Sequence, residues 1–68
     1  MSQFLVVTKD KSYLIDADEF GIFDATDGRR SVYKFFNNVN RDNLLFKYSN
    51  AELVASFDCR NVKVVIKQ

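Results

Sequence analysis

The chain carries few of the residue types that perform covalent chemistry. Its 68 residues include one cysteine, Cys59, and no histidine. A Cys–His or Ser–His pair for nucleophilic catalysis therefore cannot form, and zinc sites built from cysteine and histidine are excluded. The neighbouring Arg60 would favour a reactive thiolate, but a small structural role is the favoured interpretation of Cys59. The sequence predicts a protein that is not an enzyme and has no cofactor.

An acidic stretch from Asp16 to Asp27 partly matches a calcium-binding loop. Aspartates stand at its first and third positions, and Gly21 stands at its sixth. Phe20, at the fifth position, has no oxygen to offer, and Asp27 occupies the place where a bidentate glutamate is usual. No helical pattern flanks the stretch. We therefore interpret these carboxylates as solvated groups beside turns and predict no metal site.

Aromatic and cationic residues in the second half of the chain are the best candidates for binding. On a strand over 31–36, Tyr33 and Phe35 share one face because side chains alternate. If Val32 and Phe36 point into the core, Tyr33 and Phe35 point outward. Outward aromatics beside arginines suit a protein interface, where they act as energetic anchors, or a surface that stacks bases of single-stranded nucleic acid. The predicted binding residues are Arg29, Arg30, Tyr33, Phe35, Arg41 and Tyr48.

The charge balance favours a protein partner over nucleic acid. The net charge is only +1, whereas affinity for nucleic acid comes mainly from cations that neutralise phosphates. The leading hypothesis is a small binding or regulatory protein that docks on a larger protein. A single-stranded nucleic-acid-binding β-barrel is the alternative, and a metal-dependent protein or enzyme is the third hypothesis. Homodimerisation is compatible with all of them.

Strand patterns dominate the chain. Runs of β-branched and aromatic residues between polar turns predict strands, and the expected ones are 4–8, 12–16, 20–25, 31–36, 44–48 and 62–67. In the third, Phe20 and Ile22 share one face. In the last, the alternation predicts Val62, Val64 and Ile66 inward, with the lysines outward. Turns are expected over 9–12 and, at an Asp-Gly pair, over 26–29, and the Asn-rich stretch 37–43 is expected to be a loop.

The segment from Ser49 to Phe57 fits two structures. Ser49 and Glu52 have the spacing of a helix capping box, whereas Leu53, Ala55 and Phe57 alternate as in a strand. The strand is favoured because strands precede and follow it. The predicted fold is a single all-β domain over 1–68, an antiparallel meander of five to seven strands that forms a curled sheet or a small barrel. An open sheet with one short helix is the alternative.

The compartment is inferred from cysteine usage and from the first residues. A lone cysteine cannot form an internal disulfide, which indicates a reducing environment. No basic stretch precedes the apolar run Phe4 to Val7, and that run is too short for a signal peptide or a membrane span. The prediction is a cytoplasmic protein without a membrane segment.

The order of features resembles a recurrent type of small, β-rich protein of phages and bacteria. The matching residues are Ala17-Asp18-Glu19-Phe20, Gly28, Leu53-Val54-Ala55-Ser56-Phe57 and the Val-rich run from Val62 to Ile66. The stretch 37–43 departs from the pattern as an apparent insertion. The resemblance implies a compact β-fold and an origin in a phage or mobile element, and it brings no functional residues.

Overall fold

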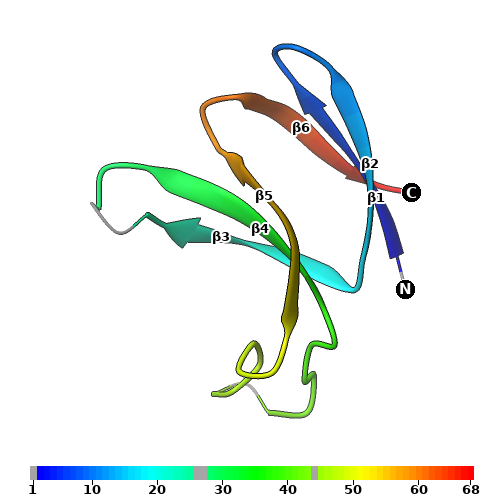
Figure 1. Ribbon diagram of the computed structural model, residues 1–68, viewed down its shortest axis with the longest axis vertical. Coiled ribbons are helices and arrows are strands. Elements are labelled where there is room, and N and C mark those ends of the chain that lie inside the picture. The colour runs from blue at the N-terminus through cyan, green and yellow to red at the C-terminus, as the bar shows by residue number, and fades with distance from the viewer. Residues whose placement is uncertain (1, 26–27, 44) are drawn as a thin grey trace.

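The computed structural model of the protein describes residues 2–25, 28–43 and 45–68, and these form six antiparallel strands (Figure 1). The strands are β1 (Ser2–Thr8), β2 (Ser12–Ala17), β3 (Glu19–Asp24), β4 (Ser31–Asn37), β5 (Glu52–Asp58) and β6 (Val62–Lys67). The predicted all-β antiparallel class is confirmed. The described ranges contain no helix long and apolar enough to cross a membrane.

The strands are divided between two three-stranded sheets with the orders β2-β1-β6 and β3-β4-β5. The chain passes from the first sheet to the second at a corner around Asp18, and it returns through the turn between β5 and β6 (Figure 1). β2 packs across β4 and β5. Within the described residues the two sheets do not close into a barrel, so of the two predicted forms, a curled sheet or a small barrel, the barrel is not formed.

The core lies between the sheets and is mostly aromatic. Four hydrophobic residues are buried among the described residues, namely Phe4, Val6, Ala17 and Phe35. The ring of Phe35 lies 5.6 Å from that of Phe4 on the opposite sheet, and 5.3 and 5.9 Å from its own neighbours Phe20 and Phe57. Aromatic rings supply large buried areas, which a domain of this size needs.

The predicted faces of β6 are correct for Val62, which packs against the core, and wrong for Val64 and Ile66. Val65 pairs with the buried Val6, whereas Val64 and Ile66 lie on the other side of the sheet and are exposed. Because three consecutive apolar residues occupy this strand, hydrophobicity alone does not select the inner face. The register with β1, which shifts between Val7 and Thr8, selects it instead.

The strand predicted over 44–48 is wrong for residues 45–48, which form turns, while Leu44 lies outside the described residues. The side chain of Asn43 explains the difference: its Oδ1 accepts hydrogen bonds from the backbone N–H groups of Leu45 and Phe46, at 3.1 and 3.3 Å. Such local bonds satisfy donors that a strand would need for pairing.

The favoured strand over the ambiguous segment is confirmed as β5. Ser49 does not cap a helix; its hydroxyl donates to the carbonyl of Phe46 at 3.0 Å. The following residues pair with β4, so that Phe57 stands opposite Tyr33 and Ala55 opposite Phe35. Cross-strand pairing thus decides the conformation of this segment, for which the local sequence allowed both a helix and a strand.

The turns that join the hairpins follow their sequence signals. Thr8 donates its N–H to the carbonyl of Lys11 at 2.9 Å, which closes the predicted turn between β1 and β2. Gly28 has a φ of 70°, in the region that favours glycine, at the predicted Asp-Gly turn between β3 and β4. Two residues of that predicted turn, Thr26 and Asp27, lie outside the described residues.

Candidate functional site

The structure does not bring the predicted binding residues together, and it contradicts the outward placement of two of them. Phe35 is 0% exposed, so the prediction that it is displayed for a partner is wrong. Tyr33 shares its face, is half-buried and lies with its ring 6.0 Å from that of Phe20. The pairing of β3 with β4 sets Phe35 opposite Phe20 on the face that meets the first sheet. Tyr33 and Phe35 do share a face, as predicted, but that face is the inner one.

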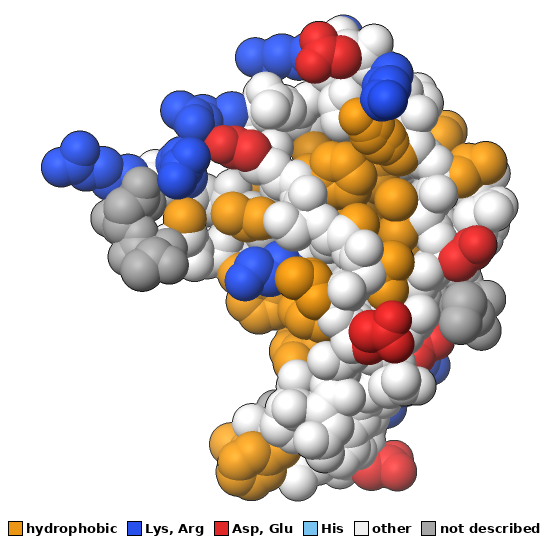
Figure 2. Space-filling view, in the orientation of Figure 1, with side chains coloured by type: hydrophobic (Ala, Val, Ile, Leu, Met, Phe, Trp, Pro, Cys, Tyr) orange, Lys and Arg blue, Asp and Glu red, His pale blue; other side chains and the backbone are white. Residues whose placement is uncertain are grey.

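Arg29 and Arg30 are exposed at the end of the β3–β4 hairpin. Arg30 reaches Asp58 with an Nη1–Oδ2 distance of 3.9 Å, and Arg60 donates to the same carboxylate from Nη2 at 3.1 Å. Several Lys and Arg side chains therefore gather where the hairpin and the β5–β6 turn meet, at the left of Figure 2. We call Arg29, Arg30 and Arg60 the cationic edge, in which Arg30 and Arg60 both reach Asp58.

The hydrogen bonds from Arg60 hold the pKa of the Asp58 carboxyl below its ordinary value. Burial, assisted by the charge of Asp58, raises the pKa of the neighbouring Cys59 thiol. A raised pKa keeps the thiol protonated and unreactive. The structural interpretation of Cys59 is therefore favoured over the reactive one, because Arg60 donates its hydrogen bonds to Asp58.

Tyr48 lies on the outer face of the second sheet, on the opposite side from Tyr33. Its ring packs 4.6 Å from that of Phe36 and 5.5 Å from that of Phe23. Two cations accompany this outer aromatic cluster: Lys34 lies 5.5 Å over the Phe23 ring and Lys47 lies 5.6 Å over the Tyr48 ring. Tyr48 thereby anchors the loop between β4 and β5 against the sheet.

The outer face of the first sheet is aliphatic, and no prediction from the sequence included it. Leu14, Leu5 and Ile66 stand side by side across the three strands, and Val7 pairs with Val64 next to them. Leu14, Val64 and Ile66 are exposed, by 61%, 43% and 44%, while Leu5 and Val7 on the central strand are half-buried. We call these five residues the aliphatic face. Apolar residues on both faces of β1 and β6 were the sequence signal for it.

A corner latch fixes the passage from β2 to β3. The N–H of Asp18 donates to the carbonyl of Phe36 at 2.9 Å and to Oδ1 of Asn37 at 3.0 Å. The Asp18 carboxylate in turn accepts the N–H of Asn38 at 2.7 Å. Asn38 has a φ of 60°, a left-handed conformation that asparagine tolerates better than most residues.

Asn38→Val is expected to destabilise the protein by about 1–3 kcal/mol, because a β-branched residue is strained at positive φ. The matched control is Asn38→Gly, which adopts this conformation without strain and keeps the backbone N–H that Asp18 accepts. Chemical denaturation of both variants checks the effect. Equal stability of the two variants would contradict the importance of the left-handed conformation.

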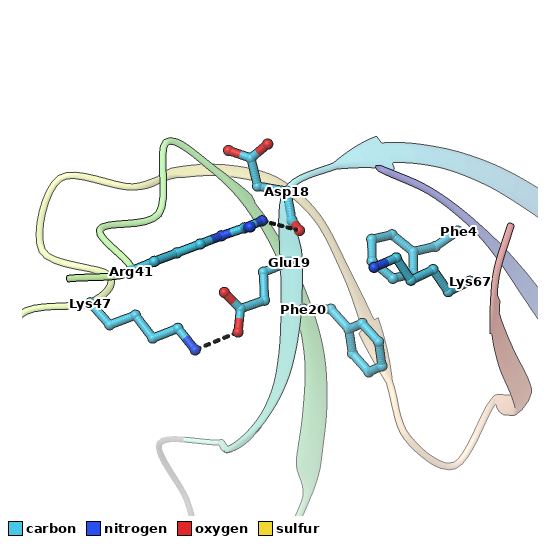
Figure 3. Close-up of a pocket in the computed structure, with 7 residues that line it drawn as sticks. All are labelled: Phe4, Asp18, Glu19, Phe20, Arg41, Lys47 and Lys67. Carbon is cyan, nitrogen blue, oxygen red and sulfur yellow. Dashed lines mark hydrogen bonds and ion pairs between the residues drawn. The ribbon is translucent and has the colours of Figure 1, made fainter. Parts of the chain in front are cut away.

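A pocket of about 500 Å³ lies beside the corner latch, between the end of β6, the start of β3 and the β4–β5 loop (Figure 3). Its lining residues are Phe4, Asp18, Glu19, Phe20, Arg41, Lys47 and Lys67. Lys47 forms an ion pair with Glu19, and that hydrogen bond raises the pKa of Lys47. Arg41 donates from Nη2 to the backbone carbonyl of Asp18 at 3.4 Å. We call this cavity the corner pocket, and Arg41 is the predicted binding residue that lines it.

The acidic stretch does not gather into a metal site in the part of the chain that the structure describes. Across those residues, no three His, Cys, Asp or Glu side chains form a group that could hold a metal ion. Asp16 accepts a hydrogen bond from Gln3 at 3.4 Å, and Asp18 belongs to the corner latch. Asp27, the last position of the calcium-loop pattern, lies outside the described residues.

Comparisons with known proteins add no relative from which a function could be transferred. The site must therefore be interpreted from its own geometry: an aliphatic face, a cationic edge, an outer aromatic cluster and a corner pocket. No family model, curated protein or solved structure matches the chain.

Proposed function

We propose that this protein is a small non-catalytic binding or regulatory protein that docks on a larger protein through its aliphatic face. The observation that carries the proposal is the exposure of Leu14, Val64 and Ile66 on one continuous sheet surface. Contiguous apolar surface on a small protein marks an interaction site more often than isolated apolar residues do. Burial of these side chains by a partner would supply the hydrophobic driving force for binding.

The position of the aliphatic face suits such docking. Its residues lie on the side of the first sheet that is opposite to Phe4 and Val6, so a partner can cover them without disturbing the core. The strands at its two sides, β2 and β6, are the edges of their sheet. A partner can therefore add backbone hydrogen bonds along either edge to the apolar contact.

The test uses the double variant Leu14→Lys, Ile66→Lys as bait, beside the wild-type protein and the control Leu45→Lys. Leu45 is 88% exposed in the β4–β5 loop, away from the aliphatic face. Each bait is incubated with lysate of the source cell, with and without nuclease, and the captured protein is purified and titrated against each bait. We expect one stoichiometric partner whose affinity falls more than about tenfold for the double variant and stays unchanged for the control.

Three results would contradict this function. A partner that binds the double variant and the wild type equally well would place the interface elsewhere. Capture that disappears with nuclease would indicate nucleic acid. A pure wild-type protein that sediments as a dimer, with a monomeric double variant, would show that a second copy covers the aliphatic face.

Single-stranded nucleic acid stays the second candidate because of the outer aromatic cluster. Phe23, Phe36 and Tyr48 are half-buried there, and Lys34 lies over one of the rings. Rings beside cations are the arrangement on which unpaired bases stack. This function would show an affinity that falls steeply with salt and with Tyr48→Ala, whereas contact through the aliphatic face depends on Leu14 and little on salt.

A further inference from the structure

We propose that the corner pocket binds a small anion that carries a planar aromatic ring, such as a nucleoside monophosphate or an aromatic carboxylate. The pocket holds about 500 Å³, within the range of about 300–1,000 Å³ that is usual for small-molecule sites. It is separate from the aliphatic face, because Phe4 and Lys67 lie on the inner side of the first sheet. The two proposals therefore stand or fall independently.

The charges of the pocket favour an anion. Glu19 and Lys47 neutralise each other in an ion pair. The Asp18 carboxylate accepts the N–H of Asn38 and points away from the other lining side chains (Figure 3). Two cations remain for a ligand, Arg41 and Lys67, and two cations can share the oxygens of one phosphate or carboxylate.

The two cations hold few protein partners. Within the described residues, Arg41 donates one hydrogen bond, of 3.4 Å, to a neutral carbonyl, and Lys67 has no ion pair or hydrogen bond through its ammonium group. The backbone of Lys67 is nevertheless fixed, because Lys67 pairs with Phe4 and the next N–H, of Gln68, donates to Gln3 at 2.8 Å. The pairing of β6 with β1 thus places the positive charge of Lys67 on the inner side of the first sheet.

The apolar part of the pocket suits a planar ring. Phe4 and Phe20 line it with their rings 5.2 Å apart in an edge-to-face arrangement. Phe20 is held from behind by Phe35, on which it stacks at 5.3 Å. A half-buried ring that is fixed by the core is a preorganised surface for a second ring, and stacking costs it little conformational entropy.

The experiment is an NMR titration of the backbone amides with AMP, indoleacetate, phenyl phosphate and inorganic phosphate. We expect saturable shifts around the corner pocket with at least one ring-bearing anion and weaker binding of inorganic phosphate. Comparison of the affinities for AMP and phenyl phosphate with the affinity for indoleacetate distinguishes a phosphate ligand from a carboxylate ligand. Arg41→Gln and Lys67→Gln should each weaken binding at least about tenfold, as expected for a hydrogen bond to a charged group.

The matched control is Lys63→Gln, which removes the other exposed lysine of β6 without touching the pocket. It should leave the affinity within about twofold, since a distant exposed charge contributes little. The proposal is overturned if none of the ring-bearing anions gives saturable shifts, if inorganic phosphate binds as tightly as they do, or if Lys63→Gln weakens binding as much as Lys67→Gln. Thermal midpoints of the variants confirm that each one is folded.

Discussion

Phe35→Ala is expected to remove most of the stability of this protein. Phe35 is fully buried, and it contacts the rings of Phe4, Phe20 and Phe57. Truncation of a buried phenylalanine costs about 3–5 kcal/mol through lost burial and the cavity that remains. Small domains are stable by only about 5–15 kcal/mol in total. The thermal midpoint should fall on the order of 20 °C, and circular dichroism during heating measures this.

The control for Phe35→Ala is Leu45→Ala, at a residue that is 88% exposed in the β4–β5 loop. Its midpoint should change little, because exposed substitutions stay within about 0.5 kcal/mol. If Phe35→Ala kept the wild-type midpoint and lost the partner instead, Phe35 would be a contact residue, as its strand pattern predicted. The pair of variants thus separates a core role from a binding role.

Gly21→Leu is expected to release the β4–β5 loop from the outer face of the second sheet. A Cβ atom at Gly21 would lie 3.0 Å from Cε1 of Phe23 and 3.4 Å from the hydroxyl of Tyr48, so a longer side chain has no room. Overpacking of this kind costs about 1–3 kcal/mol. Tyr48 must leave its place against Phe36, and trypsin should then cleave much faster after Lys47 in the loop.

The control for Gly21→Leu is Ile22→Leu, which places leucine one residue further on, on the other face of β3, at a side chain that is 60% exposed. It should keep the wild-type rate of cleavage. Equal cleavage rates of wild type and Gly21→Leu would show that Tyr48 does not hold the loop. In that case the outer aromatic cluster would be more accessible than its packing indicates.

Most strands were predictable from the local sequence because the residue types within each run themselves favour a strand. The runs that contain Phe4, Tyr13, Phe23 and Val65 are β-branched or aromatic and are bounded by polar turns, and the structure places a strand at each. The exception, over 45–48, depends on a side chain outside the run. Asn43 captures two backbone N–H groups there, which residue propensities do not include.

The faces of the strands could not be derived in the same way, and the candidate site depends on them. β4 has aromatic residues on both sides, Phe35 inside and Phe36 outside, so alternation alone does not choose between them. The choice follows from how the two sheets pack on each other, which the pattern of a single strand does not contain. The predicted binding residues therefore lie in separate places in the structure. Phe35 belongs to the core, Tyr48 anchors a loop and Arg41 lines the corner pocket.

The pocket was equally hidden from local patterns. Arg41 was recognised as a cation in a polar loop, but Lys67 resembled any outward lysine of an edge strand. Only the register of β6 against β1, with Lys67 opposite Phe4, places its ammonium group on the inner side. A site that is assembled from residues in all three thirds of the chain leaves no contiguous motif to find.

The small number of buried side chains has a thermodynamic consequence for the chain inside a cell. Four hydrophobic residues are buried among those described, whereas large apolar side chains such as Leu14, Ile22 and Leu53 face water. A ligand that binds only the folded chain shifts the folding equilibrium by an amount that grows with the logarithm of its concentration over its dissociation constant, about 2.7 kcal/mol at a hundredfold excess. At that excess, a partner bound to the aliphatic face would thus lower the unfolded fraction of this marginally stable domain about a hundredfold. Because proteases act on that fraction, the lifetime of the protein would be coupled to the abundance of whatever it binds.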